Sequence, residues 1–257
     1  MCVIFVAWQV HPGCPLIVAA NRDEFHERPT ESVHWWASDP ELLAGRDARS
    51  GGTWLGVTRT GRFAAVTNFR GPDEAAGSVS RGELPVRFLL GTTSAEDYAT
   101  GVAAAGGQYA GFSLLACDGD QLWYVSNRGD GAPRAVEPGF HGLSNANLDT
   151  PWPKVEAGRA SFAEVVGSDA DPLGNHPGAG HDQYLRVLRN ADLAAADLPD
   201  TGFPKEMERG LSSIFVELPG YGTRSSTVLA MRDGRGRMVE RRFSADSTVL
   251  GTSTAEW

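Results

Sequence analysis

The sequence predicts an α+β fold in which two mostly antiparallel sheets carry helices on their outer faces. Three observations support this: hairpin patterns fill the first half of the chain, amphipathic helical patterns lie in the middle, and another hairpin pattern comes near the end. The regular βαβ alternation of a parallel nucleotide-binding sheet is not found. With no internal repeat and no long linker, residues 1–257 are expected to form a single domain.

The strands are predicted from apolar runs that flank turn residues. Cys2–Gln9 and Leu16–Ala20 are apolar runs separated by His11-Pro12-Gly13, which indicates a strand, a tight turn and a second strand. Three further hairpins surround Thr60-Gly61, Asp118-Gly119-Asp120 and Asp233-Gly234. Their strands are expected at Thr53–Thr58 and Arg62–Asn68, at Phe112–Cys117 and Gln121–Ser126, and at Thr227–Arg232 and Arg237–Phe243.

The helices are predicted from apolar residues at helical spacing. Ser94 is a suitable N-cap, because acidic residues that favour a first helical turn follow it. Helices are expected at Arg81–Leu90, Ser94–Ala105, Lys154–Val166 and His181–Leu193. Ser168–Gly180 and Leu198–Phe203 are expected to be loops.

Composition excludes several classes of protein. The 23 Lys and Arg against 32 Asp and Glu give a formal charge of −9, which disfavours binding to nucleic acid or to an anionic membrane. The longest apolar run, Val3–Trp8, is far shorter than the ~20 residues of a spanning helix, and no secretory signal pattern is present. Three irregularly spaced cysteines predict neither a disulfide framework nor a metal site. We therefore expect a cytoplasmic protein.

Cys2 is the first candidate for chemistry. Removal of Met1 would leave a free α-amine on the residue that carries the thiol, so one residue would supply both a nucleophile and its base. An α-amine has a pKa near ~7.7–8.0 and is partly neutral at cytosolic pH. On position alone, Cys2 is better explained as a small apolar residue at the start of a strand, because short strands that begin near residue 2 are common.

Polar residues at strand ends favour the chemical interpretation. With a turn centred near Gly13, antiparallel pairing places Cys2 and Asp23 roughly opposite each other, where a carboxylate could hold the α-amine. Asn68 and Asn145 also follow apolar stretches, and their amides could donate hydrogen bonds to an oxyanion. An arginine such as Arg224 beside the thiol would lower its pKa. Taken singly, each of these is more commonly a turn residue.

Several motifs together resemble the NRDE family, whose members are similar to transport and Golgi organisation protein 2. They run over nearly the whole chain: Met1-Cys2, Asn21-Arg22-Asp23-Glu24-Phe25, Gly51-Gly52-Thr53-Trp54-Leu55-Gly56, Thr67-Asn68-Phe69, Leu143-Ser144-Asn145, Leu148-Asp149-Thr150-Pro151-Trp152-Pro153-Lys154 and Tyr221-Gly222-Thr223-Arg224-Ser225-Ser226-Thr227.

The resemblance implies the four-layer αββα sandwich of N-terminal nucleophile hydrolases, in the group of cholylglycine hydrolase and penicillin acylase. It also implies roles for individual residues. Cys2 would be the nucleophile and base, Asp23 the carboxylate beside the amine, Asn68 and Asn145 the oxyanion or substrate donors, and Arg224 the arginine near the thiol. Asn21, Arg22 and Trp54 would contact substrate.

One position departs from that group. An arginine is expected just before the Asn-x-Asp segment, and this chain has Ala20 there. Arg22 comes two positions later, and a shift of two keeps a side chain on the same face of a strand. Arg22 could therefore substitute for the expected arginine, or the thiol could lack that partner.

Two functions from different classes follow. The first is an amide or thioester hydrolase with Cys2 as nucleophile, which requires no cofactor and takes a small amide or acyl substrate. The alternative is a non-catalytic protein that carries haem, or handles acyl lipids, on the same fold. The histidines show no haem-ligand spacing, and the seven tryptophans that could line an apolar pocket are more commonly core residues.

Overall fold

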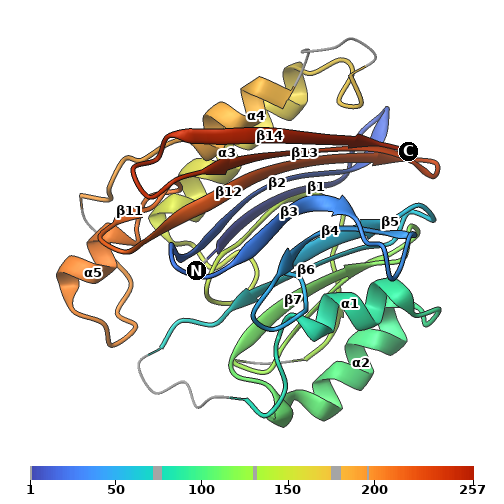
Figure 1. Cartoon of the computed structure of the whole chain (residues 1–257), viewed down its shortest axis with the longest axis horizontal. Coiled ribbons are helices and arrows are strands. Elements are labelled where there is room, and N and C mark those ends of the chain that lie inside the picture. The colour runs from blue at the N-terminus through green and yellow to red at the C-terminus, as the bar shows by residue number, and fades with distance from the viewer. Residues whose placement is uncertain (1, 72–76, 130–131, 175–180, 196) are drawn as a thin grey trace.

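Two antiparallel sheets face each other in the computed structural model, which describes residues 2–71, 77–129, 132–174, 181–195 and 197–257 (Figure 1). Within these ranges each sheet has seven strands. The first sheet runs in the order β10 (Gly139–Leu143), β1 (Cys2–His11), β2 (Cys14–Phe25), β12 (Tyr221–Arg232), β13 (Arg235–Phe243) and β14 (Val249–Glu256), and β11 (Glu217–Leu218) pairs with β12. The second runs β3 (Thr30–Trp35), β4 (Leu42–Asp47), β5 (Leu55–Thr58), β6 (Phe63–Asn68), β7 (Phe112–Cys117), β8 (Leu122–Ser126) and β9 (Arg134–Ala135).

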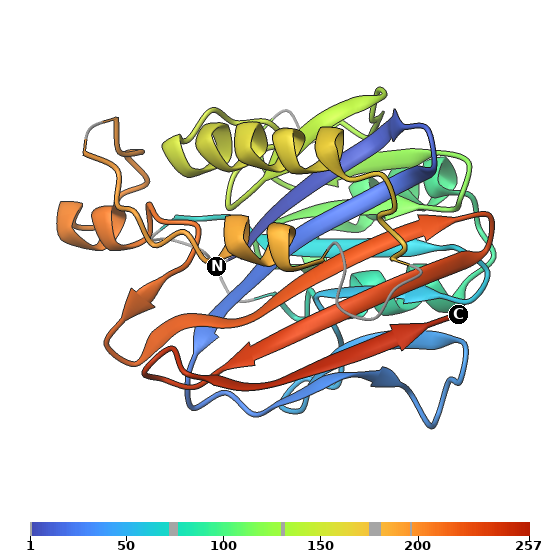
Figure 2. The same cartoon turned by 90° about the horizontal axis from the view of Figure 1, so that it is seen from above.

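Helices cover the outer faces of both sheets. The helices α3 (Pro153–Ser168) and α4 (His181–Leu188) lie over the first sheet, as the view from above shows (Figure 2). The second sheet is covered by α1 (Glu83–Leu90) and α2 (Ala95–Ala105), and α2 continues into the short 3-10 helix Gly106–Gln108. The short α5 (Lys205–Gly210) lies near β11, beyond the end of the first sheet (Figure 1). The predicted four-layer αββα sandwich is therefore confirmed.

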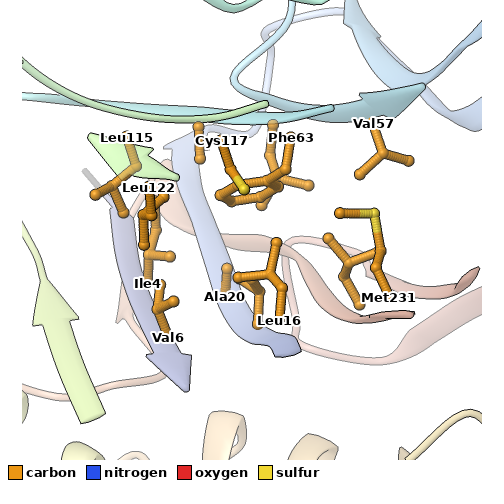
Figure 3. Close-up of a cluster of buried hydrophobic side chains, with 14 of the residues drawn as sticks. Ile4, Val6, Leu16, Ala20, Val57, Phe63, Leu115, Cys117, Leu122 and Met231 are labelled. Atoms are coloured by element: carbon orange, nitrogen blue, oxygen red, sulfur yellow. The ribbon is translucent and has the colours of Figure 1, made fainter. Parts of the chain in front are cut away.

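Three apolar layers hold the sandwich together: one lies between the sheets, and one lies between each sheet and its helices. The inter-sheet core joins side chains such as Ile4 and Leu16 of the first sheet to Phe63 and Leu115 of the second (Figure 3). The opposite face of β1, including Phe5, packs against α3 and α4. Because β1 is buried on both faces, its sequence is a continuous apolar run. Even-numbered residues of β1 face the second sheet, and Cys2 shares that face by alternation.

The predicted hairpins are confirmed, with small shifts at their ends, and Ser94 accepts a hydrogen bond from the Asp97 amide as an N-cap. The strands β3, β4, β9, β10, β11 and β14 and the helix α5 were not predicted. The helix expected at His181–Leu193 ends at Leu188, since the carbonyl of Asn190 accepts a hydrogen bond from the Phe215 amide instead of continuing the helix. None of the described helices has the length and apolar character needed to cross a membrane.

Candidate active site

Cys2 lines a cavity of about 160 Å³ between the ends of the two sheets. Its residue is 7% exposed, at the first position of β1. The first sheet contributes Cys2, Arg22, Asp23, Ser225 and Glu240 to the wall, and the segments around β5 and β6 contribute Trp54, Thr67 and Asn68. The wall is mostly polar, although the two sheets are joined by an apolar core further in.

The residue directly opposite Cys2 on β2 is Arg22, so the predicted pairing of Cys2 with Asp23 is wrong. Near the turn, His11 pairs with Cys14, but the register shifts by one residue before Trp8, which pairs with Leu16. Gln9 lies in this irregular stretch with a φ of 52°, as one additional residue on β1 is accommodated in a bulge. The bulge places Arg22, one residue earlier than expected, across from the thiol.

Arg22 lies on the cavity face of β2, two residues beyond Ala20 of the inter-sheet core. Its side chain is 8% exposed, and its Nη2 lies 3.5 Å from Oε2 of Glu24. Its Nη1 is buried and has no hydrogen-bond partner in the described part of the chain. The arginine that lies beside Cys2 is therefore Arg22, and the position expected to carry an arginine has Ala20.

The Cys2 thiol is held in its protonated form. Burial raises the pKa of this thiol, and the charge of Asp23 acts in the same direction. The positive charge of the amino terminus lowers the pKa, as do the backbone amide of Asp23 and the guanidinium of Arg22, but together they do not outweigh burial. The arginine therefore acts in the expected direction without producing a thiolate, and attack by Cys2 requires a base that removes its proton.

Asp23 is buried next to Cys2 and is fixed from β12. Its Oδ1 accepts a hydrogen bond of 2.7 Å from Oγ1 of Thr223, and its carbonyl accepts one of 3.0 Å from the Tyr221 hydroxyl. Burial raises the pKa of the Asp23 carboxyl, whereas the charges of Lys154 and Arg70 lower it. The carboxylate thus belongs to a buried group of charges at the start of β1.

Lys154 belongs to this group of charges, and sequence reasoning did not assign it a role. It lies at the start of α3, is 4% exposed, and donates a hydrogen bond of 2.9 Å from Nζ to the carbonyl of Leu211. Burial and then the charge of Arg70 lower its pKa to about 8, while Asp23 and Cys2 oppose the shift. The only sequence signal was its position at the end of the Leu148–Lys154 motif.

Arg70 and Glu208 complete the group with a buried ion pair. Nη1 of Arg70 lies 2.6 Å from Oε2 of Glu208, and both side chains are less than 5% exposed. The guanidinium of Arg70 also stacks on Trp152 at 4.6 Å from the ring centre, and Thr201 donates a hydrogen bond to Glu208. Because Glu208 belongs to α5, this unpredicted helix is tied to the site.

Asn68 and Asn145 are brought together, but only Asn68 lines the cavity. Nδ2 of Asn145 donates to the carbonyl of Asn68 at 3.1 Å and to its Oδ1 at 3.0 Å, so both amide protons are used. Oγ of Ser144 lies 3.2 Å from Oδ1 of Asn145 and 3.0 Å from the carbonyl of Cys2. Asn145 therefore fixes the orientation of Asn68, whose own Nδ2 makes only a 3.4 Å contact with the carbonyl of Phe69.

Asn21 does not line the cavity. Its Nδ2 donates to the carbonyls of Leu188 and Ile214 at 2.8 and 2.9 Å, and its Oδ1 accepts from Ser226 at 2.6 Å. Asn21 thus joins β2 to the helix layer. Trp54, the third residue expected to contact substrate, does line the cavity and also packs against the inter-sheet core.

Arg224 is not brought to the thiol, contrary to the prediction. It lies at the register shift between Thr223 and Ser225 on β12. Its Nη1 donates to the carbonyls of Phe25, His26 and Arg28 at 2.9–3.2 Å. Because this irregularity re-aims the side chain, Arg224 holds the chain after β2, and the arginine next to Cys2 is Arg22.

Among the described residues, no group of three or more His, Cys, Asp and Glu side chains is arranged to hold a metal ion. The described residues that line the cavity include no histidine.

Comparison with known proteins gives a family and relatives that match along most of the chain. The family described as Transport and Golgi organisation 2 matches residues 1–245. The transport and Golgi organization protein 2 homolog of Bos taurus is 37% identical over 278 aligned residues, covering 100% of this chain and 99% of the relative. The Homo sapiens homolog is 36% identical over 259 aligned residues, and this alignment covers 94% of this chain and 92% of the human relative.

A solved structure, the C2A mutant of conjugated bile acid hydrolase from Clostridium perfringens, aligns with a TM-score of 0.48 and 9% sequence identity. That alignment covers 100% of this chain and 92% of the hydrolase.

Proposed function

This chain belongs to the Transport and Golgi organisation 2 family, and we propose that it is an amide or thioester hydrolase whose nucleophile is Cys2. The observation that carries the proposal is the position of Cys2 at the wall of a polar cavity, directly opposite Arg22, with Asp23 and Asn68 lining the same cavity. Removal of Met1 would free the α-amine of the same residue as a base.

The proposed reaction needs no cofactor. The α-amine of Cys2 accepts the thiol proton while Sγ attacks the acyl carbonyl, and the buried Asp23 carboxylate stabilises the resulting ammonium. Asn68 donates its amide hydrogen bond to the oxyanion. The carbon–nitrogen or carbon–sulfur bond then breaks, and the ammonium returns the proton to the leaving group. Water, deprotonated by the amine, then attacks the thioester of the acyl-enzyme. The tetrahedral intermediate releases the acid and expels the thiolate, which takes the proton back from the ammonium and so becomes the thiol again.

Burial of the thiol supports this order of events. A thiol with a raised pKa is not a standing thiolate, so its nucleophilicity depends on proton transfer during attack. An α-amine on the same residue meets that need without help from another side chain. Asn145 contributes by fixing Asn68, so it is a positioning residue in this scheme.

Intact mass measured with and without iodoacetamide at neutral pH tests the proposal. We expect that Met1 is absent and that Cys2, which lines the cavity, is labelled before Cys14 and Cys117, which are each 1% exposed. Acyl amides and thioesters are then screened, and Cys2→Ala is expected to abolish turnover.

A matched control carries one additional glycine between Met1 and Cys2. This keeps the thiol but converts the α-amine of Cys2 into a peptide amide, so turnover should be lost as in Cys2→Ala. If the purified protein retains Met1, or if the glycine variant hydrolyses substrate as well as the wild type, the proposal is wrong.

The competing proposal is that the chain carries haem or an acyl lipid. The cavity beside Cys2, about 160 Å³, is smaller than the ~300–1,000 Å³ of sites that enclose most of a drug-sized ligand, so haem would have to bind in an open site. Titration with haem, followed by Soret absorbance, separates the two proposals. A saturable Soret shift in a protein without Cys2-dependent turnover would favour carriage.

A further inference from the structure

The cavity beside Cys2 has two buried polar groups that have no hydrogen-bond partner in the part of the chain that the structure describes. These are Nη1 of Arg22 and Oγ1 of Thr67, neither of which has a hydrogen-bond partner among the described residues. Thr67 is 1% exposed and the Arg22 side chain is 8% exposed, and both residues line the cavity. An unpaired buried hydroxyl costs about 1–3 kcal/mol, and an unpaired charged donor costs more. Such a cost favours a bound partner, water or a ligand group, at these two donors.

The two groups come from opposite walls of the same cavity. Arg22 lies on β2 of the first sheet, and Thr67 lies on β6 of the second. Phe63 and Ala65 on β6 belong to the inter-sheet core, so Thr67 faces the first sheet by alternation. A ligand group between them would therefore receive donors from both sheets.

The other arginines that line the cavity already have protein partners. Arg28 pairs with Asp47 at 2.6 Å, Arg81 donates to the carbonyl of Gly111, and Arg46 stacks on Trp36 and donates to the carbonyl of Gly51.

The carboxylates of the cavity do not fully neutralise Arg22. Glu24 lies 3.5 Å from its Nη2 but is shared with Arg28, at 3.6 Å. Asp47 is held by Arg28, and Glu31 lies near His34. Glu240 accepts a hydrogen bond from the Val33 amide, and burial raises the pKa of its carboxyl, whereas the charges of Arg242 and Arg22 lower it. Asp23 also lines the cavity and accepts a hydrogen bond from Thr223. The ion pair with Glu24 therefore engages Nη2 of Arg22, and Nη1 is left without a hydrogen-bond partner in the described part of the chain.

We propose that Arg22 and Thr67 bind a carboxylate of the substrate, within a few bonds of the carbonyl that Cys2 attacks. The inference rests on the proposed function and narrows its substrate class to acyl amides or thioesters that carry a nearby carboxylate. The short separation follows from the register, because directly paired residues have Cβ atoms about 4.5–5.5 Å apart. A guanidinium matches the planar shape of a carboxylate, and the threonine hydroxyl adds a second donor.

Equilibrium binding to the full chain carrying Cys2→Ala tests this without any hydrolysis. Two pairs of probes are titrated and followed by the NMR signals of the ¹⁵N-labelled protein. N-acetylglycine carries its carboxylate on the amine side of the amide bond, and N-acetylglycinamide is its neutral counterpart. Succinamic acid carries its carboxylate on the acyl side of the amide bond, and succinamide is its neutral counterpart. We expect one of the two acids to bind at least tenfold more tightly than its neutral amide, which also identifies the side that carries the charge.

Three further variants assign the effect. Arg22→Gln should reduce the preference for the acid to less than threefold, and Thr67→Val, which keeps the shape of the side chain, should weaken binding of the acid several-fold. Arg46→Gln is the matched control, since Arg46 lines the same cavity but is held by Trp36, and it should retain the preference.

Equal binding of acid and amide in both pairs would overturn the inference, as would a preference that survives Arg22→Gln. Thr67→Val gives an answer even if Arg22→Gln does not fold. Because Cys2→Ala cannot form the acyl-enzyme, a negative result here leaves the hydrolase proposal untouched, and a failure of hydrolysis leaves this binding result untouched.

Discussion

Asn21 and Arg22 are neighbours on β2, but their side chains lie on opposite faces of the strand and differ in how many of their hydrogen-bonding groups have partners. On the helix side, Asn21 is fully buried and makes three hydrogen bonds, to Leu188, Ile214 and Ser226. On the cavity side, Arg22 is almost as buried, but its Nη1 has no partner in the described part of the chain. The comparison indicates that one face of this strand end stabilises the fold, whereas the other holds donors ready for a ligand.

Substitution of Asn21 should have the largest effect on stability. Asn21→Ala removes three buried hydrogen bonds and leaves the carbonyls of Leu188 and Ile214 without this donor. We expect the free energy of unfolding to fall by about 3–4 kcal/mol, since each buried hydrogen bond contributes about 1 kcal/mol. Urea denaturation measures the change. A loss below about 1 kcal/mol would show that the helix side does not depend on Asn21.

The buried Lys154 should make stability depend on pH. Its pKa is lowered to about 8 in the folded protein against 10.5 as its ordinary value, so between these values the unfolded chain binds more protons. Stability from this group therefore rises as pH increases from 8 towards 10.5, and the cost of burying its charge is present below pH 8. We expect the wild type to gain about 2–3 kcal/mol relative to Lys154→Met over this range.

The matched control is Lys205→Met, because Lys205 also follows a proline at the start of a helix but is exposed. Urea denaturation at a series of pH values should give the Lys205→Met protein the same pH dependence as the wild type. Parallel curves for the wild type and Lys154→Met would contradict the assignment of the buried charge.

Arg22 should show the smallest effect on stability. Arg22→Gln removes a buried charge whose ion pair with Glu24 is long, at 3.5 Å, and whose Nη1 has no hydrogen-bond partner among the described residues. Glu24 keeps Arg28 at 3.6 Å, so the free energy of unfolding should change by less than about 1 kcal/mol. Urea denaturation would then show a large loss in the free energy of unfolding for Asn21→Ala and almost no loss for Arg22→Gln at the next residue. A loss of 3 kcal/mol or more for Arg22→Gln would remove the contrast between the two faces.

The sequence predicted the layers better than the site. Hairpins such as Phe112–Cys117 with Gln121–Ser126 depend on local turn residues, which the sequence displays directly. The strand β14 was missed because it is a largely exposed edge strand with few apolar residues. Cys2, Asp23, Trp54 and Asn68 were placed at one cavity, since strand ends meet at one edge of the sandwich.

The errors at the site share a physical cause. Two irregularities in strand pairing, near Gln9 and at Arg224, decided which arginine lies beside Cys2. A bulge depends on packing along the whole strand and leaves little trace in the local sequence. Lys154 was overlooked for a related reason, because a lysine in the first turn of a helix usually faces solvent and only tertiary packing buries it.

The bulge at Gln9 also has a practical use. Because of the bulge, the pairing at Cys2 does not depend on the length of the turn between His11 and Cys14. The register near Cys2 is enforced instead by apolar packing on both faces of β1. The turn can therefore be lengthened without moving the nucleophile. A short peptide tag or a fluorescent reporter inserted between Pro12 and Gly13 would label the protein at the far end of the hairpin and leave the native amino terminus, on which the proposed chemistry depends, unmodified.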